Sequence, residues 1–207
     1  MKNRLNGLLN EGPIKKTVNT HYSVGIIVKK GPNCEPLVLV YRKRNKGTKK
    51  WIPRFPGSKQ RKGEIPIDTL LRACGEKLGF SSSDAFRWIR IHTLNRVLAG
   101  EEHPQVVFLY SVSESEGDFC FRKEIKEVID KKTGITEEWG PPEWMSLSEA
   151  MEKLLWTHRS HLLLSLPQIK RRECFSKYIN FNTNKVVVSP PPKWIRWIVS
   201  PRFCARN

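Results

Sequence analysis

The segments "FPGSKQRKGE", residues 55–64, and "RACGEKLGF", residues 72–80, carry the pattern that decides the fold. Glycines, a glutamate and an arginine at this spacing are typical of a loop and helix that hold phosphate and a metal ion. Positions 73, 76 and 77 lie within one helical turn, so carboxylates there would form a hard-oxygen site for Mg²⁺. This chain has Ala73 and Lys77 at two of them, beside Glu76. The pattern therefore raises the question whether the chain cleaves a phosphate ester or only binds one.

Apolar, β-branched runs predict strands on both sides of this segment. They cover residues 22–30, 36–44, 86–97 and 104–113. The short connection between the last two predicts an antiparallel pair. Together with two helical segments, the order strands, helix, strands, helix predicts an α+β or α/β sandwich.

The first predicted helix covers residues 63–80, because its apolar residues recur at helical spacing. The residues on that face are Ile67, Leu70, Leu71, Cys74 and Leu78. Asp68 near the start and Gly79 at the end suit helix termini. Since Cys74 lies on the apolar face, it is predicted to belong to the core rather than to act as a nucleophile.

The second predicted helix covers residues 146–166, where Ser146 and Glu149 form a capping-box pattern. Beyond Pro167 the pattern decays, and "SPPPKW", residues 189–194, indicates a linker or an extended arm. The chain is thus divided into an N-terminal arm, residues 1–19, a domain, residues 20–166, and a basic extension, residues 167–207.

The positive charge of the chain is concentrated in two stretches. The formal net charge is +17, yet residues 41–62 contain no acid and residues 170–207 contain only Glu173. Such stretches attract polyanions, so RNA or DNA is the first candidate partner and an anionic membrane surface the second, against a merely solvated basic face. The candidate nucleic-acid-binding residues are Lys49, Lys50, Arg61, Lys193, Trp194 and Trp197. The two tryptophans could equally lie at a membrane interface or pack on the domain.

The remaining composition indicates a cytoplasmic protein. No run of about 18 apolar residues predicts a spanning helix, and the N-terminus lacks the apolar stretch of a secretory signal. The five cysteines are scattered and form no CxxC pair, which favours neither a zinc site nor a disulfide framework.

The two opening segments resemble the Nudix box, G-x5-E-x7-R-E-U-x-E-E-x-G-U, where U is a bulky apolar residue. The match is gapless when Ser58 takes the first glycine. The other matching residues are Glu64, Arg72, Cys74, Glu76, Gly79 and Phe80. The flank "W-x-x-x-FPG", residues 51–57, is similar to family members as well. The late segment "EEWGPPEWMSLSEA", residues 137–150, resembles the family's late acidic loop and the entry to its last helix.

This resemblance implies a Nudix-like α/β/α sandwich with a mixed sheet. It also implies hydrolysis of nucleoside diphosphates linked to another group, with Mg²⁺ or Mn²⁺ and a water. Substrates in the family range from damaged nucleotides to dinucleoside polyphosphates and capped RNA ends. By the match, the candidate metal ligands are Glu64, Glu76, Glu137, Glu138 and the backbone of Ser58, with Glu76 and Glu138 as catalytic candidates. The candidate phosphate-binding residues are Arg72, Lys77, Arg42 and Arg44.

The departures from the box weaken that expectation. Ala73 replaces a glutamate that binds metal or serves as base in the family, and Lys77 replaces the second glutamate of the pair. The ammonium of Lys77 could take a cation's place and hold a phosphate directly, or it could face solvent in a dead site. Glu64 and Glu76 could equally brace the loop by pairing with bases such as Arg72.

Three hypotheses of function follow. The first is a non-catalytic or weakly catalytic Nudix-fold protein that binds nucleotide or RNA phosphates, within a larger complex or alone. The second is a working Mg²⁺-dependent pyrophosphohydrolase that uses Glu64, Glu76 and either Glu137 or Glu138. The third is a basic structural subunit of a nucleoprotein.

Overall fold

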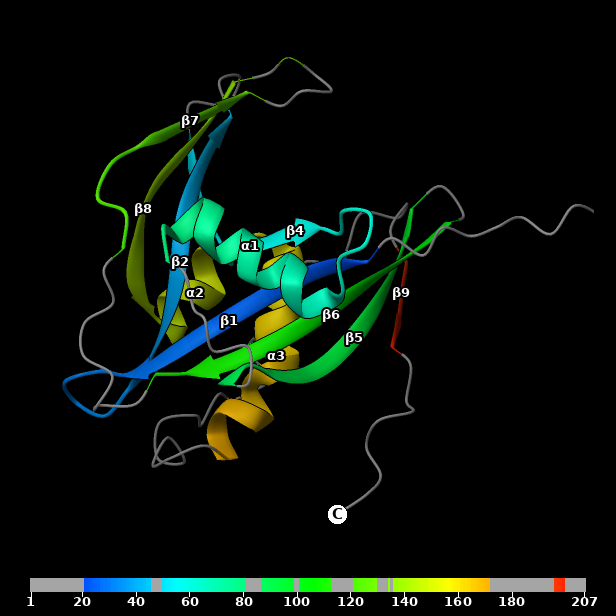
Figure 1. Cartoon of the computed structure of the whole chain (residues 1–207). Helices are drawn as coiled ribbons and strands as arrows, with labels where there is room; N and C mark the ends of the chain where they lie inside the picture. Colours follow the sequence, from blue (N-terminus) through cyan, green and yellow to red (C-terminus); the bar gives the residue numbers. More distant parts are fainter. Residues whose placement is uncertain are drawn as a thin grey trace, which may run out of the picture.

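The structure is a computed structural model that describes residues 21–45, 50–80, 87–98, 101–112, 121–129, 134, 136–171 and 196–199. In this part of the chain nine strands form one sheet and three helices cover it (Figure 1). The strands are β1 (Tyr22–Lys30), β2 (Pro36–Asn45), β3 (Trp51–Arg54), β4 (Gly57–Lys59), β5 (Ile89–Leu98), β6 (Glu101–Ser111), β7 (Lys126–Ile129), β8 (Thr136–Ser146) and β9 (Arg196–Val199). The helices are α1 (Pro66–Leu78), α2 (Leu147–Lys153) and α3 (Trp156–Arg171).

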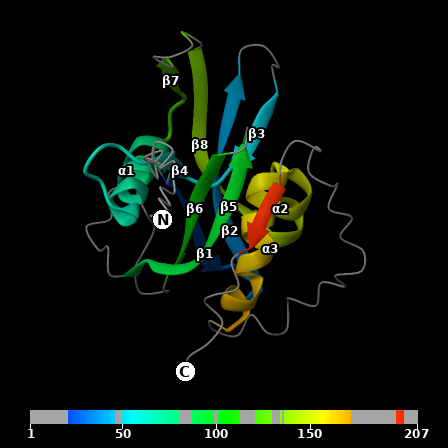
Figure 2. The ribbon, with the colours of Figure 1, turned by 90° about the vertical axis from the view of Figure 1, so that its right-hand side faces the viewer.

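The sheet is mixed, as expected. Its order is β7-β8-β2-β1-β6-β5-β9, with β3 paired to β2 and β4 paired to β1. The β1–β6 pair is parallel, whereas β5 and β6 form the predicted antiparallel pair. Helix α1 covers one face of the sheet, and α2 and α3 cover the other (Figure 2). The predicted α/β/α sandwich is therefore confirmed.

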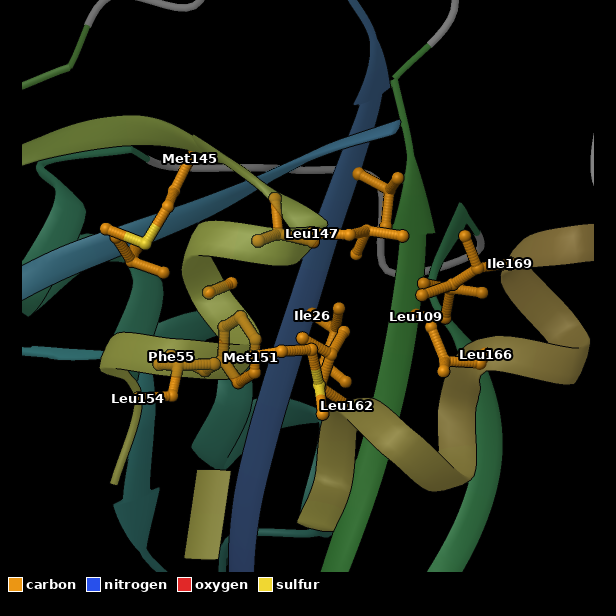
Figure 3. Close-up of a cluster of buried hydrophobic side chains, with 14 of the residues drawn as sticks. Ile26, Phe55, Leu109, Met145, Leu147, Met151, Leu154, Leu162, Leu166 and Ile169 are labelled. Atoms are coloured by element: carbon orange, nitrogen blue, oxygen red, sulfur yellow. The ribbon is translucent and has the colours of Figure 1, made fainter. Parts of the chain in front are cut away.

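Each face of the sheet has its own apolar core, because alternate residues of the central strands point to opposite sides. On the side of α2 and α3, strand residues such as Ile26 and Leu109 pack against Leu162 and Ile169 of α3 (Figure 3). On the side of α1, the predicted apolar face of the helix is buried. Leu70, Cys74 and Leu78 are all 0% exposed and pack on Ile27, Leu39 and Val106.

The ends of α1 follow the local sequence signals. At the start, Pro66 needs no hydrogen-bond donor, and the carboxylate of Asp68 accepts a hydrogen bond from the backbone N–H of Ile65 at 3.3 Å. At the end, Gly79 has φ of 70°, a conformation that side chains with a Cβ adopt rarely. A Cβ on Gly79 would also lie 2.9 Å from the Cβ of Arg122, so the close approach requires glycine.

The single helix predicted for residues 146–166 is wrong in two respects. The chain forms α2 and α3 instead, separated at Leu154, whose ψ of 145° is extended. The helix also continues past Pro167 to Arg171, because Ile169 is buried in the core and holds the last turn in place. The predicted N-cap is present, since the Ser146 hydroxyl accepts a hydrogen bond from the backbone N–H of Glu149 at 3.2 Å.

The late acidic segment is a strand rather than the expected loop. Residues 137–146 belong to β8, which pairs along the length of β2. Trp139 is buried in the core on the side of α1, and Met145 is buried in the core on the side of α2 and α3. A shift of register between Trp139 and Pro142 changes which side of the sheet the following residues face.

The basic extension is described in two pieces, the end of α3 and strand β9. β9 pairs with β5 at the far edge of the sheet from β7, with Leu94 opposite Val199. The N-terminal arm lies outside the described residues. No helix of the described part is long and apolar enough to cross a membrane.

Candidate phosphate site

Arg72 braces the loop that carries the start of the box. Its Nε lies 2.6 Å from Glu64 Oε1, and its Nη1 donates to Ser58 Oγ at 3.1 Å and to Glu76 Oε1 at 3.2 Å. Its Nη2 donates to the carbonyl of Lys59 at 2.9 Å. The hydrogen bond from Arg72 is the main cause that lowers the pKa of Glu64 to about 2. The donors of Arg72 are therefore directed at protein acceptors, and Glu64 is held as a carboxylate.

Glu76 is held by two guanidinium groups. Besides Arg72, the exposed Arg61 donates to Glu76 Oε1 from Nη2 at 3.0 Å. Arg61, a candidate for nucleic-acid binding, thus has a protein partner of its own. This surface pair contributes little to stability, because an exposed guanidinium is well solvated.

Lys77 lies at the centre of the site and is buried, with 8% of its surface exposed. Its Nζ donates to the backbone carbonyl of Gly57, the residue before Ser58. The same nitrogen lies 5.7 Å from the ring centroid of Tyr41 and 5.6 Å from that of Trp139. Burial, together with a smaller effect of the nearby cations Lys43 and Arg54, lowers the pKa of Lys77 to about 8. A buried ammonium thus lies beside the turn that precedes the candidate metal ligand Ser58.

The acids of β8 are paired across the sheet with the bases of β2. Lys43 pairs with Glu137 and Arg44 pairs with Glu138, because β8 lies antiparallel to β2 with Arg44 opposite Glu138. Arg42 pairs with Glu143, with Nε 2.5 Å from Oε1. One candidate metal ligand, Glu138, therefore meets a candidate phosphate ligand, Arg44, while Glu137 and Arg42 each have another partner of opposite charge.

These residues do not fit a divalent metal ion. Glu64, Glu76, Glu137 and Glu138 each have a cationic partner. Among the described residues, no group of three or more His, Cys, Asp or Glu side chains is arranged to hold a metal. Mg²⁺ favours sites with free carboxylates and phosphates, and this donor set offers neither. Ala73, at the position of a lost glutamate, is fully buried.

Several functional candidates that the sequence analysis did not select surround Lys77. They are Tyr41, Arg54 and Trp139, and Lys126 lies over the ring of Trp139. A sequence signal was present for β2, where Tyr41 and Lys43 are two residues apart and so share one face of the strand. No local signal brings Lys126 or Trp139 to Lys77, because they lie on separate strands.

The remaining candidates for nucleic-acid binding stay predictions. Lys50 is exposed at the start of the segment that leads into β3. Trp197 lies on β9, opposite Arg96 of β5. Lys49, Lys193 and Trp194 lie outside the described residues.

A family model, the NUDIX domain, matches residues 19–166. The chain belongs to the Nudix family. No curated protein matches it in sequence. Nudix hydrolases generally use Mg²⁺ or Mn²⁺.

Solved Nudix structures share the fold. The NUDIX domain of Shewanella oneidensis NrtR, in complex with ADP ribose, superposes with a TM-score of 0.53 at 13% identity over 77% of this chain and 94% of that chain. The C. elegans Ap4A hydrolase, in a binary complex, gives 0.50 at 14% identity over 73% and 98%. The Nudix hydrolase RenU of M. smegmatis gives 0.52 at 11% over 74% and 87%. At these identities the likeness concerns the fold alone.

Proposed function

We propose that this chain is a Nudix-fold protein that binds the phosphates of a nucleotide or an RNA without a divalent ion, and that hydrolyses them weakly or not at all. The observation that carries the proposal is the hydrogen bond from the Lys77 ammonium to the carbonyl of Gly57. It supports the view that the Lys77 ammonium supplies the positive charge that a divalent metal ion supplies in other family members.

Electrostatics opposes a metal at this position. Two like charges about 4 Å apart repel by about 4 kcal/mol at an effective dielectric constant near 20, and a doubly charged ion doubles that. The acids that could offset the repulsion already hold Arg72, Lys43 and Arg44. Ala73 also removes a candidate general base, whose loss typically lowers a rate by about 100- to 10,000-fold.

Binding of phosphates is supported by charge and by fold. The formal net charge of +17 favours polyanions such as RNA, and the stretch 41–62, which contains no acid, includes Gly57 and Ser58 of the site. The NUDIX domain of the Shewanella protein holds ADP ribose in the same fold. We therefore expect nucleoside diphosphate derivatives and RNA 5′ ends to be the ligand class.

The proposal is tested by measuring binding and turnover in parallel. We expect ADP-ribose and 5′-triphosphorylated RNA to bind with the same affinity in EDTA and in Mg²⁺. Turnover with either metal should lie far below the common range of about 1 to 1,000 per second. Binding of the RNA should weaken with salt, with a log–log slope of about −0.7 for each phosphate neutralised.

The other outcomes distinguish the alternatives. Rapid turnover that Glu76→Gln abolishes would support a working Mg²⁺-dependent pyrophosphohydrolase. Failure to bind either nucleotide or RNA, with and without Mg²⁺, would instead support a structural subunit whose basic surface contacts a protein or an assembled particle.

A further inference from the structure

Four cationic side chains from different elements gather around two aromatic rings on the α1 side of the sheet. They are Lys43 of β2, Arg54 of β3, Lys77 of α1 and Lys126 of β7. The rings of Tyr41 and Trp139 lie 6.2 Å apart, edge to face. Lys77 Nζ is within 6 Å of both ring centroids, and Lys126 Nζ lies 5.9 Å from the centroid of Trp139. We call these four side chains the cation cluster.

Strand register places the cluster on one face. Arg54 is directly opposite Tyr41 in the β2–β3 pair, so the two side chains leave the sheet on the same side. Lys43 follows Tyr41 by two residues and shares that face. Lys126 is directly opposite Trp139 in the β7–β8 pair. Register therefore places Lys43, Arg54 and Lys126 on the face of the sheet that α1 covers, with β2 and β8 between β3 and β7.

The cluster carries more positive charge than the described protein groups balance. Lys43 pairs with Glu137, but Lys77 donates to a neutral carbonyl and Lys126 lies over a ring. Arg54 forms no ion pair among the described residues, and its buried Nε has no acceptor there. Buried donors in native proteins are almost always bonded, and an exception calls for an ion, a water or a ligand. The arrangement lacks an anion.

We infer that the cation cluster is a metal-independent subsite for a pyrophosphate group, in which Arg54 and Lys126 donate to the phosphate oxygens. The inference rests on the proposed function and assigns the phosphate site within it. Arg54 suits the role because a guanidinium can bond two oxygens of one phosphate at once. The exposed ammonium of Lys126 can reach the second phosphate. Lys77 is buried against Gly57, so it contributes positive potential rather than a direct contact.

Two adjoining phosphates match the cluster better than a single carboxylate does. Three of its four cations lack a carboxylate partner in the described structure, and a pyrophosphate carries the multiple negative charges that would balance them. The same group occurs in free nucleoside diphosphates and triphosphates and at the 5′ end of triphosphorylated RNA. The chemistry is shared, and the experiment separates the two sources.

The test measures the affinity of the full chain for inorganic pyrophosphate by calorimetry at pH 7 in EDTA. Arg54→Gln should weaken binding by about tenfold or more, since it removes charge-assisted hydrogen bonds. Lys126→Gln should weaken it by about threefold to tenfold. Lys62→Gln is the matched control, because it removes one exposed charge from the same acid-free stretch, and it should change affinity by less than about twofold.

A conservative variant separates geometry from charge. Arg54→Lys keeps the positive charge but loses the fork of donors, so its affinity should fall between that of the wild type and that of Arg54→Gln. Lys126 is exposed on an edge strand, so Lys126→Gln keeps the test decisive if a change at Arg54 disturbs folding.

Proton uptake gives a second readout. The charged and titratable groups that act on Lys77 are Glu76 and Cys74 on its helix, Lys43 on β2 and Arg54 on β3. Glu137 and Lys126 contact Trp139, whose ring lies next to Lys77. Since the pKa of Lys77 is lowered to about 8, a nearby bound anion should raise it. At pH 8 binding should therefore take up as much as about half a proton, and Lys77→Met should abolish this uptake.

The outcomes separate the subsite from the proposed function. If pyrophosphate binds but Arg54→Gln and Lys126→Gln change its affinity no more than Lys62→Gln does, the subsite is overturned while the proposed function stands. The same holds if pyrophosphate fails to bind but ADP-ribose or RNA binds. If none of these ligands binds, the proposed function itself fails. An equal loss of affinity for ATP and for 5′-triphosphorylated RNA in Arg54→Gln supports a subsite that both ligands use. A loss of affinity for only one of them identifies that ligand as the source of the pyrophosphate group.

Discussion

The two faces of the central sheet both bury ionisable side chains, but they leave them in opposite states. On the α1 face, Lys77 is buried against the Gly57 carbonyl and two rings. On the face of α2 and α3, His158 and His161 lie within the apolar core. His161 Nε2 is 2.7 Å from Gln105 Oε1, and the ring of His158 packs edge-on to Phe55 at 5.8 Å.

The difference shows that the same desolvation has different consequences for a lysine and for a histidine. Burial disfavours the charged form in both. The pKa of Lys77 starts at 10.5 and is lowered to about 8, so the side chain stays mostly protonated at pH 7. Histidine starts at 6.5, and burial lowers the pKa of His161 to about 3 and that of His158 well below its usual value. One face therefore keeps a charge for binding, while the other keeps neutral imidazoles for packing.

The largest expected effect is loss of stability in mild acid from the histidine face. Because the folded pKa values of His158 and His161 lie below 6.5, the unfolded chain binds protons first as the pH falls. Their contribution is complete above pH 6.5 and is lost progressively below it. Two such groups should lower the free energy of unfolding by about 4 kcal/mol between pH 6.5 and 5. Urea titrations at several pH values measure this.

A variant and a second group make this measurement specific. His158→Leu should remove about a third of the pH dependence, since the imidazoles of His161 and of His92, whose pKa burial lowers to about 4, still titrate. Glu64, whose pKa is lowered to about 2, stabilises the fold above its ordinary pKa of 4.5, and this stability is lost only at lower pH. It therefore does not affect the pH dependence between 6.5 and 5. Constant stability from pH 7 to 5 would contradict the assignment of neutral, buried imidazoles.

The second effect is a gain in stability when the buried charge of the α1 face is removed. Lys77→Met keeps the length of the side chain without the ammonium, and an apolar replacement of a buried charge is often stabilising. The pKa difference between 10.5 and about 8 corresponds to a cost of about 3 kcal/mol at pH 7. Loss of the hydrogen bond to Gly57 offsets about 1 kcal/mol, so a net gain of about 2 kcal/mol is expected.

The pH dependence of this gain identifies its cause. The folded pKa of Lys77 is lowered, so the wild type gains stability as the pH rises from about 8 to 10.5, where the unfolded chain still binds the proton. The difference between Lys77→Met and the wild type should therefore shrink across that window in thermal melts. A difference that does not change with pH would point to packing, and a destabilised variant would make Lys77 a net contributor to the fold.

The local parts of the fold could be predicted from the sequence. The apolar face of α1, its end at Gly79 and the Ser146 cap depend on residues within about one or two helical turns, and all are confirmed. The break at Leu154 and the helix beyond Pro167 could not be predicted in this way. They depend on how α2 and α3 fit the same sheet face, which the periodicity of one segment does not report.

The candidate site was predictable in its parts and not in its pairing. The family match selected Glu64, Arg72, Glu76 and Lys77, which are close in sequence and close in space. The partners of Lys77, Tyr41 and Trp139, come from strands far along the chain. The pairing of Arg44 with Glu138 spans 94 residues and depends on strand register. Register follows from tertiary structure, so the occupation of these acids by bases was not visible in the sequence.

The smallest expected effect is an electrostatic link between the two faces through Arg54. This guanidinium lowers the pKa of both Lys77 on one face and His158 on the other. Arg54→Gln should therefore raise both pKa values. Each should rise by only a fraction of the shift that burial causes, because burial is the largest cause for both groups. NMR titration of the Lys77 side chain measures the change in the pKa of Lys77, with Lys62→Gln as the control for loss of an exposed charge. The acid-induced loss of stability should also be slightly smaller than in the wild type, since a raised folded-state pKa of His158 lies closer to that of the unfolded chain. An unchanged Lys77 titration would place Arg54 outside the cation cluster and separate the two faces electrostatically.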